Sequence, residues 1–144
     1  MIIKHGNMFD ASKADMIFCT TNGVVTKYGA LIMGAGAARN MKERHEGIES
    51  YFGSKLKAGQ VNKYGIIYGK SRGAFQTKYN YNDKSDLDLI VFSAQKLAAL
   101  ANQHPHLTFA INFPGIGYGG LSRTVVTSAI ETILPNNVEV WLLK

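Results

Sequence analysis

The sequence predicts an α/β fold, a three-layer α/β/α sandwich built around a mixed, mostly parallel sheet. Three observations favour this class. Short apolar runs of strand length alternate with segments whose apolar residues recur at helical spacing. Two glycine-rich segments follow expected strands, where such a sheet connects a strand to a helix. No linker, repeat or low-complexity tract interrupts the alternation, so a single domain over residues 1–144 is expected.

The expected strands are short apolar runs bounded by turn residues. The run at 15–20 is the clearest, because it is apolar without interruption from Met16 to Cys19, as in strands that are buried on both faces. Asn22-Gly23 then ends the strand, since this dipeptide strongly favours a turn. The strands expected from this pattern cover residues 1–4, 15–20, 64–68, 74–79, 107–113 and 138–143.

Helices are expected between the strands, and the one over 85–102 has the strongest pattern. Ser85 is its expected N-cap, and Asp86 and Asp88 suit the positive end of the helix dipole. Pro105 follows its end. Its apolar stripe consists of Leu87, Ile90, Val91, Ala94, Leu97 and Ala98. Further helices are expected over 35–43, over 47–56, and from a cap at Ser122 to about residue 134.

Composition excludes several classes of protein. Hydrophobic residues make up 46% of the 144 residues and charged residues 18%, which indicates a folded globular chain rather than a disordered one. No apolar run approaches the roughly 18–20 residues that span a bilayer, and the N-terminal segment lacks the long apolar stretch of a signal peptide. We therefore expect a cytoplasmic (intracellular) protein with no membrane partner.

The single cysteine and the four histidines give no reason to expect a disulfide or a metal. Cys19 lies within an apolar run, so a buried structural thiol is expected rather than a nucleophile. The histidines are scattered, with no cysteine or acidic partners at ligand spacing. Neither a metal nor any other cofactor is therefore expected.

The formal net charge of +6 predicts attraction to polyanions, among them nucleotides, nucleic acids and phosphorylated metabolites. The basic residues are spread along the chain rather than gathered in a block or an aromatic-interleaved RNA motif. The charge thus indicates the sign of a ligand without identifying it.

The first candidate segment combines Asn22 with the glycine-rich stretch 28–38. Its glycines leave backbone N–H groups open to an anion, and the helix that follows adds its positive N-terminus. A loop that merely needs left-handed turns is the alternative. The segment is not a dinucleotide fingerprint, because Arg39 stands where a third small residue would be needed.

The second candidate segment is 113–122, in which four of the six residues from 115 to 120 are glycines. A backbone nest that closes on a pyrophosphate would explain this density, and a wide turn without a ligand is the alternative. The third segment, 74–85, is a polar loop with aromatic residues. Taken alone, its Lys78 would be a solvated lysine.

These segments, in this order, resemble the macro domain family. They are most similar to the branch that holds the terminal ADP-ribose protein glycohydrolases and the antitoxin-type DNA ADP-ribosyl glycohydrolases. The likeness covers nearly the whole chain and rests on four motifs: Gly6-Asn7-Met8-Phe9, the loop Met33-Gly34-Ala35-Gly36-Ala37-Ala38, the loop from Pro114 to Leu121, and Phe75-Gln76-Thr77-Lys78 followed by Ser85.

The resemblance implies that the ligand is ADP-ribose, free or attached to a protein or nucleic acid. It places the adenine near Asn7 and Met8. It also implies that Asn22 orients the distal ribose. Lys78 matches the lysine implicated in cleaving the bond at the anomeric carbon. By the same resemblance, the distal ribose and its phosphate are bound by Gly34, Ala35, Gly36 and Ala37. The diphosphate is bound by Gly115, Ile116, Gly117, Tyr118, Gly119 and Gly120.

Two departures from the family pattern bear on function. Asn7 stands where the family usually has an aspartate that accepts from the adenine amino group, and an amide accepts without charge assistance. Leu121-Ser122 follows the second loop, where the protein-directed branch places an acid. The sequence therefore does not support a mechanism that needs a lysine–aspartate pair.

Three kinds of function stay open at this level. The first is an ADP-ribosyl hydrolase that removes ADP-ribose from a modified macromolecule, with Lys78 as the catalytic residue. The second is an ADP-ribose reader without turnover, or a phosphatase of ADP-ribose 1″-phosphate. The third is a basic nucleic-acid-binding domain, suggested only by the net charge and by Tyr79 and Tyr81.

Overall fold

Six strands form one sheet in the computed structural model, which describes residues 1–143. Neighbouring strands are parallel except for β3 and β4, which form an antiparallel hairpin at one edge. The predicted mixed, mostly parallel sheet is therefore confirmed. In spatial order the strands are β1 (Ile2–His5), β6 (Val138–Leu142), β5 (Phe109–Asn112), β2 (Met16–Thr21), β4 (Arg72–Gln76) and β3 (Ile66–Gly69).

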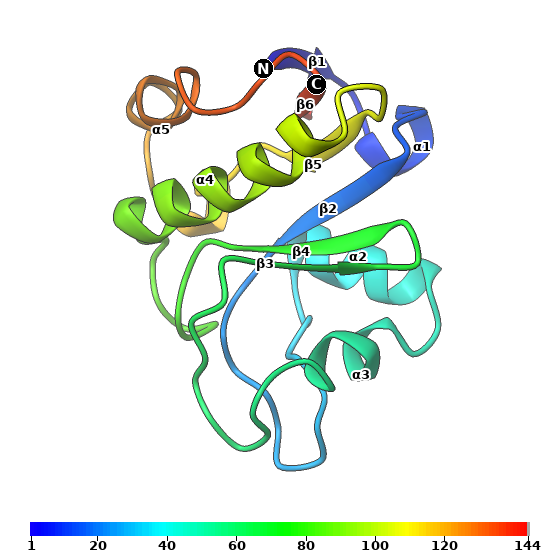
Figure 1. Ribbon diagram of the computed structural model, residues 1–144. Coiled ribbons are helices and arrows are strands. Elements are labelled where there is room, and N and C mark those ends of the chain that lie inside the picture. Colours follow the sequence, from blue (N-terminus) through cyan, green and yellow to red (C-terminus); the bar gives the residue numbers. More distant parts are fainter. Residues whose placement is uncertain (144) are drawn as a thin grey trace.

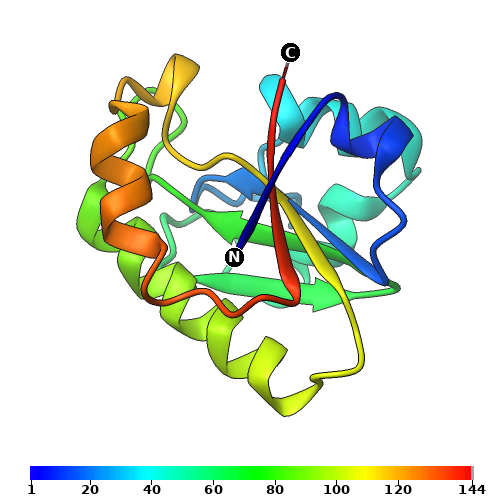
Figure 2. The same cartoon turned by 90° about the horizontal axis from the view of Figure 1, so that it is seen from above.

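Helices cover both faces of the sheet, which confirms the three-layer arrangement (Figure 1). Helices α4 (Leu87–Gln103) and α5 (Arg123–Ile130) lie on one face, and α2 (Gly36–Arg44) and α3 (Ile48–Gly53) lie on the other. In Figure 2, β1 in blue runs beside β6 in red, so the first and last strands of the chain are neighbours. Within residues 1–143, no helix has the length and apolar character to cross a membrane.

The central strand β2 divides the core in two. Phe18 packs with α4 and α5, whereas Ile17 and Cys19 pack with α2 and α3. Both faces of β2 are therefore buried, as its uninterrupted apolar run predicts. Cys19 is fully buried, and burial raises the pKa of its thiol to about 12. The expectation of a structural thiol is confirmed.

One short helix was not expected from the sequence. Residues 8–11 form the single-turn helix α1 (Met8–Ala11), whose N-cap is Asn7. The side-chain oxygen of Asn7 accepts a hydrogen bond from the N–H of Phe9 at 3.0 Å. An asparagine before a helix is a familiar capping signal, but four residues are too few to show helical periodicity.

The third and fourth strands occupy different residues from those expected. The hairpin turn lies at Lys70 and Ser71, which have φ angles of 56° and 64°, and β4 therefore begins at Arg72 rather than at residue 74. β4 also ends at Gln76, three residues earlier than the apolar and aromatic pattern predicts. The segment that carries Lys78 is consequently a loop and not a strand.

The N-cap of α4 also differs from the prediction. Asp86, not Ser85, is the capping residue, and its carboxylate accepts from the N–H of Leu89 at 3.1 Å. The N–H of Ser85 instead donates to the carbonyl of Gly119 at 2.9 Å. Both residues are good caps by type, so the sequence pattern alone could not choose between them.

Replacing Asp86 by alanine should lower the free energy of unfolding by about 1 kcal/mol, because the N–H of Leu89 loses its acceptor. Asp88→Ala removes the same charge from the first turn without removing the cap, and should cost only about 0.3 kcal/mol. Urea denaturation of both variants measures the difference. Equal losses would show that the charge matters and the capping bond does not.

Candidate functional site

A cavity of about 910 Å³ opens where five strands reach their carboxyl ends. Gly6 follows β1, Asn22 follows β2, and Thr77 follows β4; the loop after β5 and the residue after β6 complete the rim. Parallel strands point these ends to the same edge of the sheet, which is where ligands bind in folds of this class. We call this cavity the cleft.

The cleft brings together residues that are far apart in the sequence. Every residue named above for ADP-ribose, together with Lys78, lines it, except Gly120. Gly120 has φ 76° and donates its N–H to the carbonyl of Gly117 at 3.0 Å, so it forms a turn at the end of the second loop. The two glycine-rich segments thus line one cavity, although about eighty residues separate them.

The first loop, residues 33–38, includes the first residues of α2, which begins at Gly36. Within the described residues 1–143, no hydrogen bond uses the backbone N–H groups of Gly34, Ala35, Gly36 or Ala37. Gly36 has φ 57°, a conformation that favours glycine. An added Cβ at Gly34 would meet no protein atom within 4 Å, so the space beside it belongs to the cleft and not to the core.

The second loop, residues 114–120, offers further unused donors. In residues 1–143, no acceptor is found for the backbone N–H groups of Ile116, Gly117 and Tyr118. Gly115 and Gly117 have φ angles of 81° and 66°, so this path of the chain favours glycine at both positions. The side chain of Tyr118 is 90% exposed at the mouth of the cleft.

Asn22 and Asn7 line the cleft, but both side chains already hold the backbone. Asn22 donates to the carbonyl of Ile32 at 3.0 Å and accepts from the N–H of Val24 at 2.8 Å. It therefore joins the end of β2 to Ile32, just before the first loop, and retains one N–H for a ligand. Asn7 caps α1 through its side-chain oxygen, and within residues 1–143 its side-chain amino group makes no hydrogen bond.

Lys78 is half-buried on a loop that is tied to the end of β2 on both sides. The N–H of Thr77 donates to the carbonyl of Thr21 at 3.0 Å, and the N–H of Gly23 donates to the carbonyl of Tyr79 at 2.8 Å. Among residues 1–143, no acidic side chain forms an ion pair with Lys78. The missing acid noted in the sequence is therefore not replaced from elsewhere in that part of the chain.

A half-buried tyrosine, Tyr64, supports the end of β2. The hydroxyl of Tyr64 donates to the carbonyl of Asn22 at 2.8 Å and also forms a short hydrogen bond with the hydroxyl of Thr21. Burial raises the pKa of the Tyr64 phenol well above its usual range. Tyr64 therefore stays protonated and keeps its bond to Asn22.

Sequence reasoning missed several residues of the cleft. Asn112, at the end of β5, accepts from the N–H of Thr20 at 3.0 Å and donates to its hydroxyl at 2.9 Å. These two bonds hold the ends of β2 and β5 together beside the cleft. Trp141 belongs to the core, with 8% exposure, yet it also lines the cleft. The sequence signal that could have indicated Asn112 is a polar residue at the end of an expected strand. No sequence signal indicates Trp141 as a residue of the cleft.

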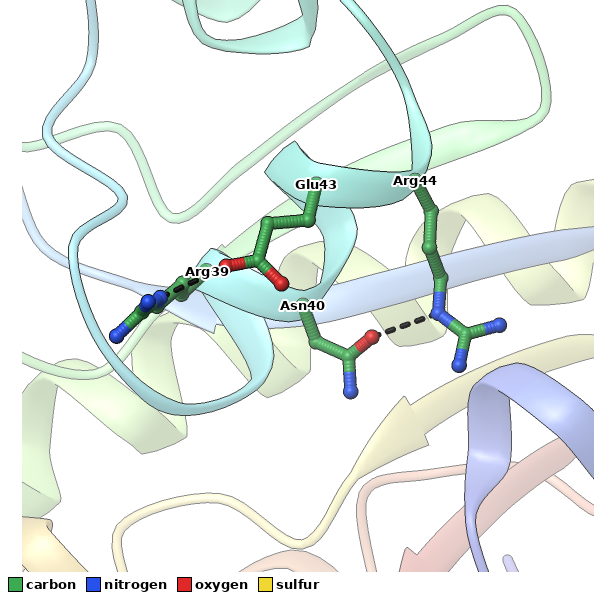
Figure 3. A network of polar contacts seen from close by, with 4 residues as sticks. All are labelled: Arg39, Asn40, Glu43 and Arg44. Carbon is green, nitrogen blue, oxygen red and sulfur yellow. Dashed lines mark hydrogen bonds and ion pairs between the residues drawn. The ribbon is translucent and has the colours of Figure 1, made fainter.

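Asn40 is a further missed residue, on the second turn of α2. Its side-chain oxygen accepts from Arg44 at 2.6 Å, next to the ion pair between Arg39 and Glu43 at 2.8 Å (Figure 3). Arg44 also pairs with Asp10 of α1 at 2.9 Å. This network joins α1 to α2, the two helices that begin at the cleft. Within residues 1–143, no three His, Cys, Asp or Glu side chains come together as a metal site.

A search with the sequence finds no matching protein-family model and no matching curated protein. Solved structures do match. The macrodomain of DarG from Thermus aquaticus is 21% identical, with a TM-score of 0.67, and the match covers 99% of this chain and 97% of that chain. The macrodomain of Mycobacterium tuberculosis DarG is 18% identical, with a TM-score of 0.70 and 97% coverage of both chains.

A third match is to a longer protein. Thermosipho africanus DarTG, solved in complex with ADP-ribose, is 18% identical with a TM-score of 0.74. The match covers 100% of this chain but only 42% of the DarTG chain, so this chain corresponds to less than half of that protein. At these identities the likeness establishes the shared architecture: the chain has the macrodomain fold.

Proposed function

We propose that the cleft binds ADP-ribose, with the diphosphate held by the backbone of the two glycine-rich loops. The observation that carries this proposal is the set of unused N–H groups that both loops bring to one cavity. Backbone donors at a glycine-rich loop and at a helix N-terminus suit a pyrophosphate because they approach closely and add positive potential. The net charge of +6 attracts such an anion from solution.

The resemblance to the macro domain family assigns the remaining parts of the ligand. The adenosine end lies near Asn7 and Met8, where Phe9 and Trp141 add aromatic surface to the cleft. The distal ribose lies towards Asn22 and the first loop. The ADP-ribose complex of the structurally similar DarTG supports the same ligand class for this chain.

We further propose that the protein is an ADP-ribosyl hydrolase in which Lys78 acts at the anomeric carbon of the distal ribose. The bond between this carbon and the acceptor breaks, water supplies the hydroxyl group, and the acceptor takes up the proton. The loops hold the substrate in one orientation, and a fixed backbone keeps Lys78 beside it. Residues 1–144 act as one domain in this proposal.

A reader without turnover is the second candidate, and one observation favours it. No acid pairs with Lys78 in residues 1–143, and none follows the second loop at Leu121-Ser122. Release assays with ester-, arginine- and thymidine-linked ADP-ribose separate the two functions. Release from any of them supports the hydrolase, whereas tight binding without release supports the reader. Phosphate release from ADP-ribose 1″-phosphate would instead indicate the phosphatase.

Replacing Gly34 by valine should weaken ADP-ribose binding about tenfold or more, because overpacking a close contact costs about 1–3 kcal/mol. The side chain would meet no protein atom within 4 Å of its Cβ, so the free energy of unfolding should change by less than about 0.5 kcal/mol. Calorimetric titration and urea denaturation measure the two quantities.

The matched control is Ala58→Val, which adds two methyl groups at an exposed position outside the cleft. It should leave both binding and stability unchanged. Wild-type affinity in Gly34→Val would place the ligand elsewhere. Salt-dependent binding to oligonucleotides that ADP-ribose fails to displace would favour the nucleic-acid-binding function over both candidates.

A further inference from the structure

Gln76 is the last residue of β4 and lies two residues before Lys78. Its side chain is fully buried, with 0% exposure, although a glutamine is seldom buried so completely. It lies outside the cleft, behind the residues that line it. Such a polar residue costs stability unless its hydrogen bonds are all made.

Every polar group of Gln76 has a partner. The main-chain N–H donates to the carbonyl of Gly65 at 2.7 Å, and the main-chain carbonyl accepts from the hydroxyl of Ser93 at 2.7 Å. The side-chain oxygen accepts from the N–H groups of Tyr64 and Gly65 at 2.8 and 3.2 Å. The side-chain nitrogen donates to the carbonyls of Asn62 and Lys78 at 2.8 and 3.3 Å.

The side-chain amide therefore joins two segments that have no strand pairing between them. One is residues 62–65, which includes Tyr64 with its hydrogen bond to Asn22. The other is the main chain of Lys78 itself. Only an amide side chain supplies two donors and two acceptors in one plane, so neither a carboxylate nor an apolar side chain could make all four bonds.

The glycine at position 23 leaves room for the hydrogen bonds of the Gln76 side chain. An added Cβ at Gly23 would lie 2.8 Å from the side-chain nitrogen of Gln76 and would overlap the carbonyl of Asn62. Gly23 also holds the carbonyl of Tyr79, the residue after Lys78. The main chain around Lys78 is thus held by hydrogen bonds to Thr21 and Gly23 at the end of β2, and by the side chain of Gln76.

From this arrangement we infer that Gln76 is a positioning residue for Lys78: its amide fixes the main chain of Lys78 relative to Tyr64 and so to Asn22 at the end of β2. The inference rests on the proposed function of Lys78 in releasing ADP-ribose. Gln76 does not touch the ligand, so it acts on the rate of release rather than on ADP-ribose affinity.

Two substitutions and one control test the assignment. Gln76→Met keeps the length of the side chain and removes all four side-chain hydrogen bonds, and Gln76→Glu keeps the acceptors and removes the donors. The control, Ser93→Ala, removes the bond to the main-chain carbonyl of the same residue and leaves the amide untouched. Circular dichroism first establishes that each variant is folded.

Hydrogen exchange of the amides in residues 77–81 should become about tenfold faster in both Gln76 variants and stay at the wild-type rate in Ser93→Ala. Single-turnover release of ADP-ribose should slow by about tenfold or more, because a small misplacement of a reacting group has large effects on rate. The Kd for ADP-ribose should stay within about threefold of wild type.

Wild-type exchange at residues 77–81 in both Gln76 variants would overturn the assignment. Equal effects in Ser93→Ala, or loss of the native fold in both Gln76 variants, would do the same, since Gln76 would then be a general stabilising residue. The exchange result is independent of turnover. If the wild-type protein released no ADP-ribose, the proposed reaction would fail while the exchange rates still decided whether Gln76 positions Lys78.

Discussion

Replacing Lys78 by alanine should slow release of ADP-ribose from a modified acceptor by about 100-fold or more, with ADP-ribose affinity within about threefold of wild type. The reason is geometric. Lys78 lies at the rim of the cleft on a loop tied to the end of β2, whereas the unused backbone donors lie on the two glycine-rich loops. Binding and bond cleavage therefore depend on different parts of the site. Single-turnover kinetics and calorimetry measure the two effects separately.

The matched control for this substitution is Lys13→Ala, which removes the same charge from an exposed position outside the cleft. It should leave both rate and affinity unchanged. Equal rates of release in Lys78→Ala and wild type would contradict the catalytic assignment. Equal losses of affinity and rate would instead assign Lys78 to binding.

Gly23→Ala should lower the free energy of unfolding by about 3 kcal/mol or more, at the upper end of what overpacking a buried site costs. The added methyl group would overlap the carbonyl of Asn62 and crowd the side chain of Gln76, and both neighbours belong to a fully bonded network. Neither can move without weakening the hydrogen bonds Asn62 makes to Gln76 at 2.8 Å and to Gly23 at 2.7 Å. Urea denaturation measures the loss.

Gly34→Ala is the control for that prediction, since an added Cβ there has no protein atom within 4 Å. Its free energy of unfolding should stay within about 0.5 kcal/mol of wild type. If Gly23→Ala were as stable as Gly34→Ala, the segments around Gly23 and Asn62 would not be packed as closely as described.

Much of the fold could be predicted because the longer strands and helices carry clear apolar patterns in the sequence. The run from Met16 to Cys19 predicts a strand buried on both faces, and both cores do meet on β2. The stripe over 85–102 predicts α4 to within two residues. Short elements gave no such signal. The helix α1 has four residues, and the hairpin turn at Lys70-Ser71 uses left-handed conformations without glycine.

The cleft could be predicted in part, for a reason that lies in the fold. Glycine-rich loops after parallel strands reach the same edge of the sheet, so their convergence follows from topology. Individual side-chain roles do not follow. Asn22 proves to be occupied by main-chain bonds to Val24 and Ile32, and Gln76 stood out only as part of the expected strand 74–79 and of the motif that ends at Lys78. Such roles depend on contacts between segments, which no local pattern reveals.

The central claim is that the two glycine-rich loops hold the diphosphate of ADP-ribose with their backbone N–H groups. The most direct measurement is a titration with ADP-ribose followed by the backbone amide resonances of the protein in NMR. Saturable one-site shifts that are largest at residues 34–37 and 115–119 are the predicted result. Unshifted resonances at both loops with ADP-ribose in large excess, or shifts confined to another surface, would contradict it.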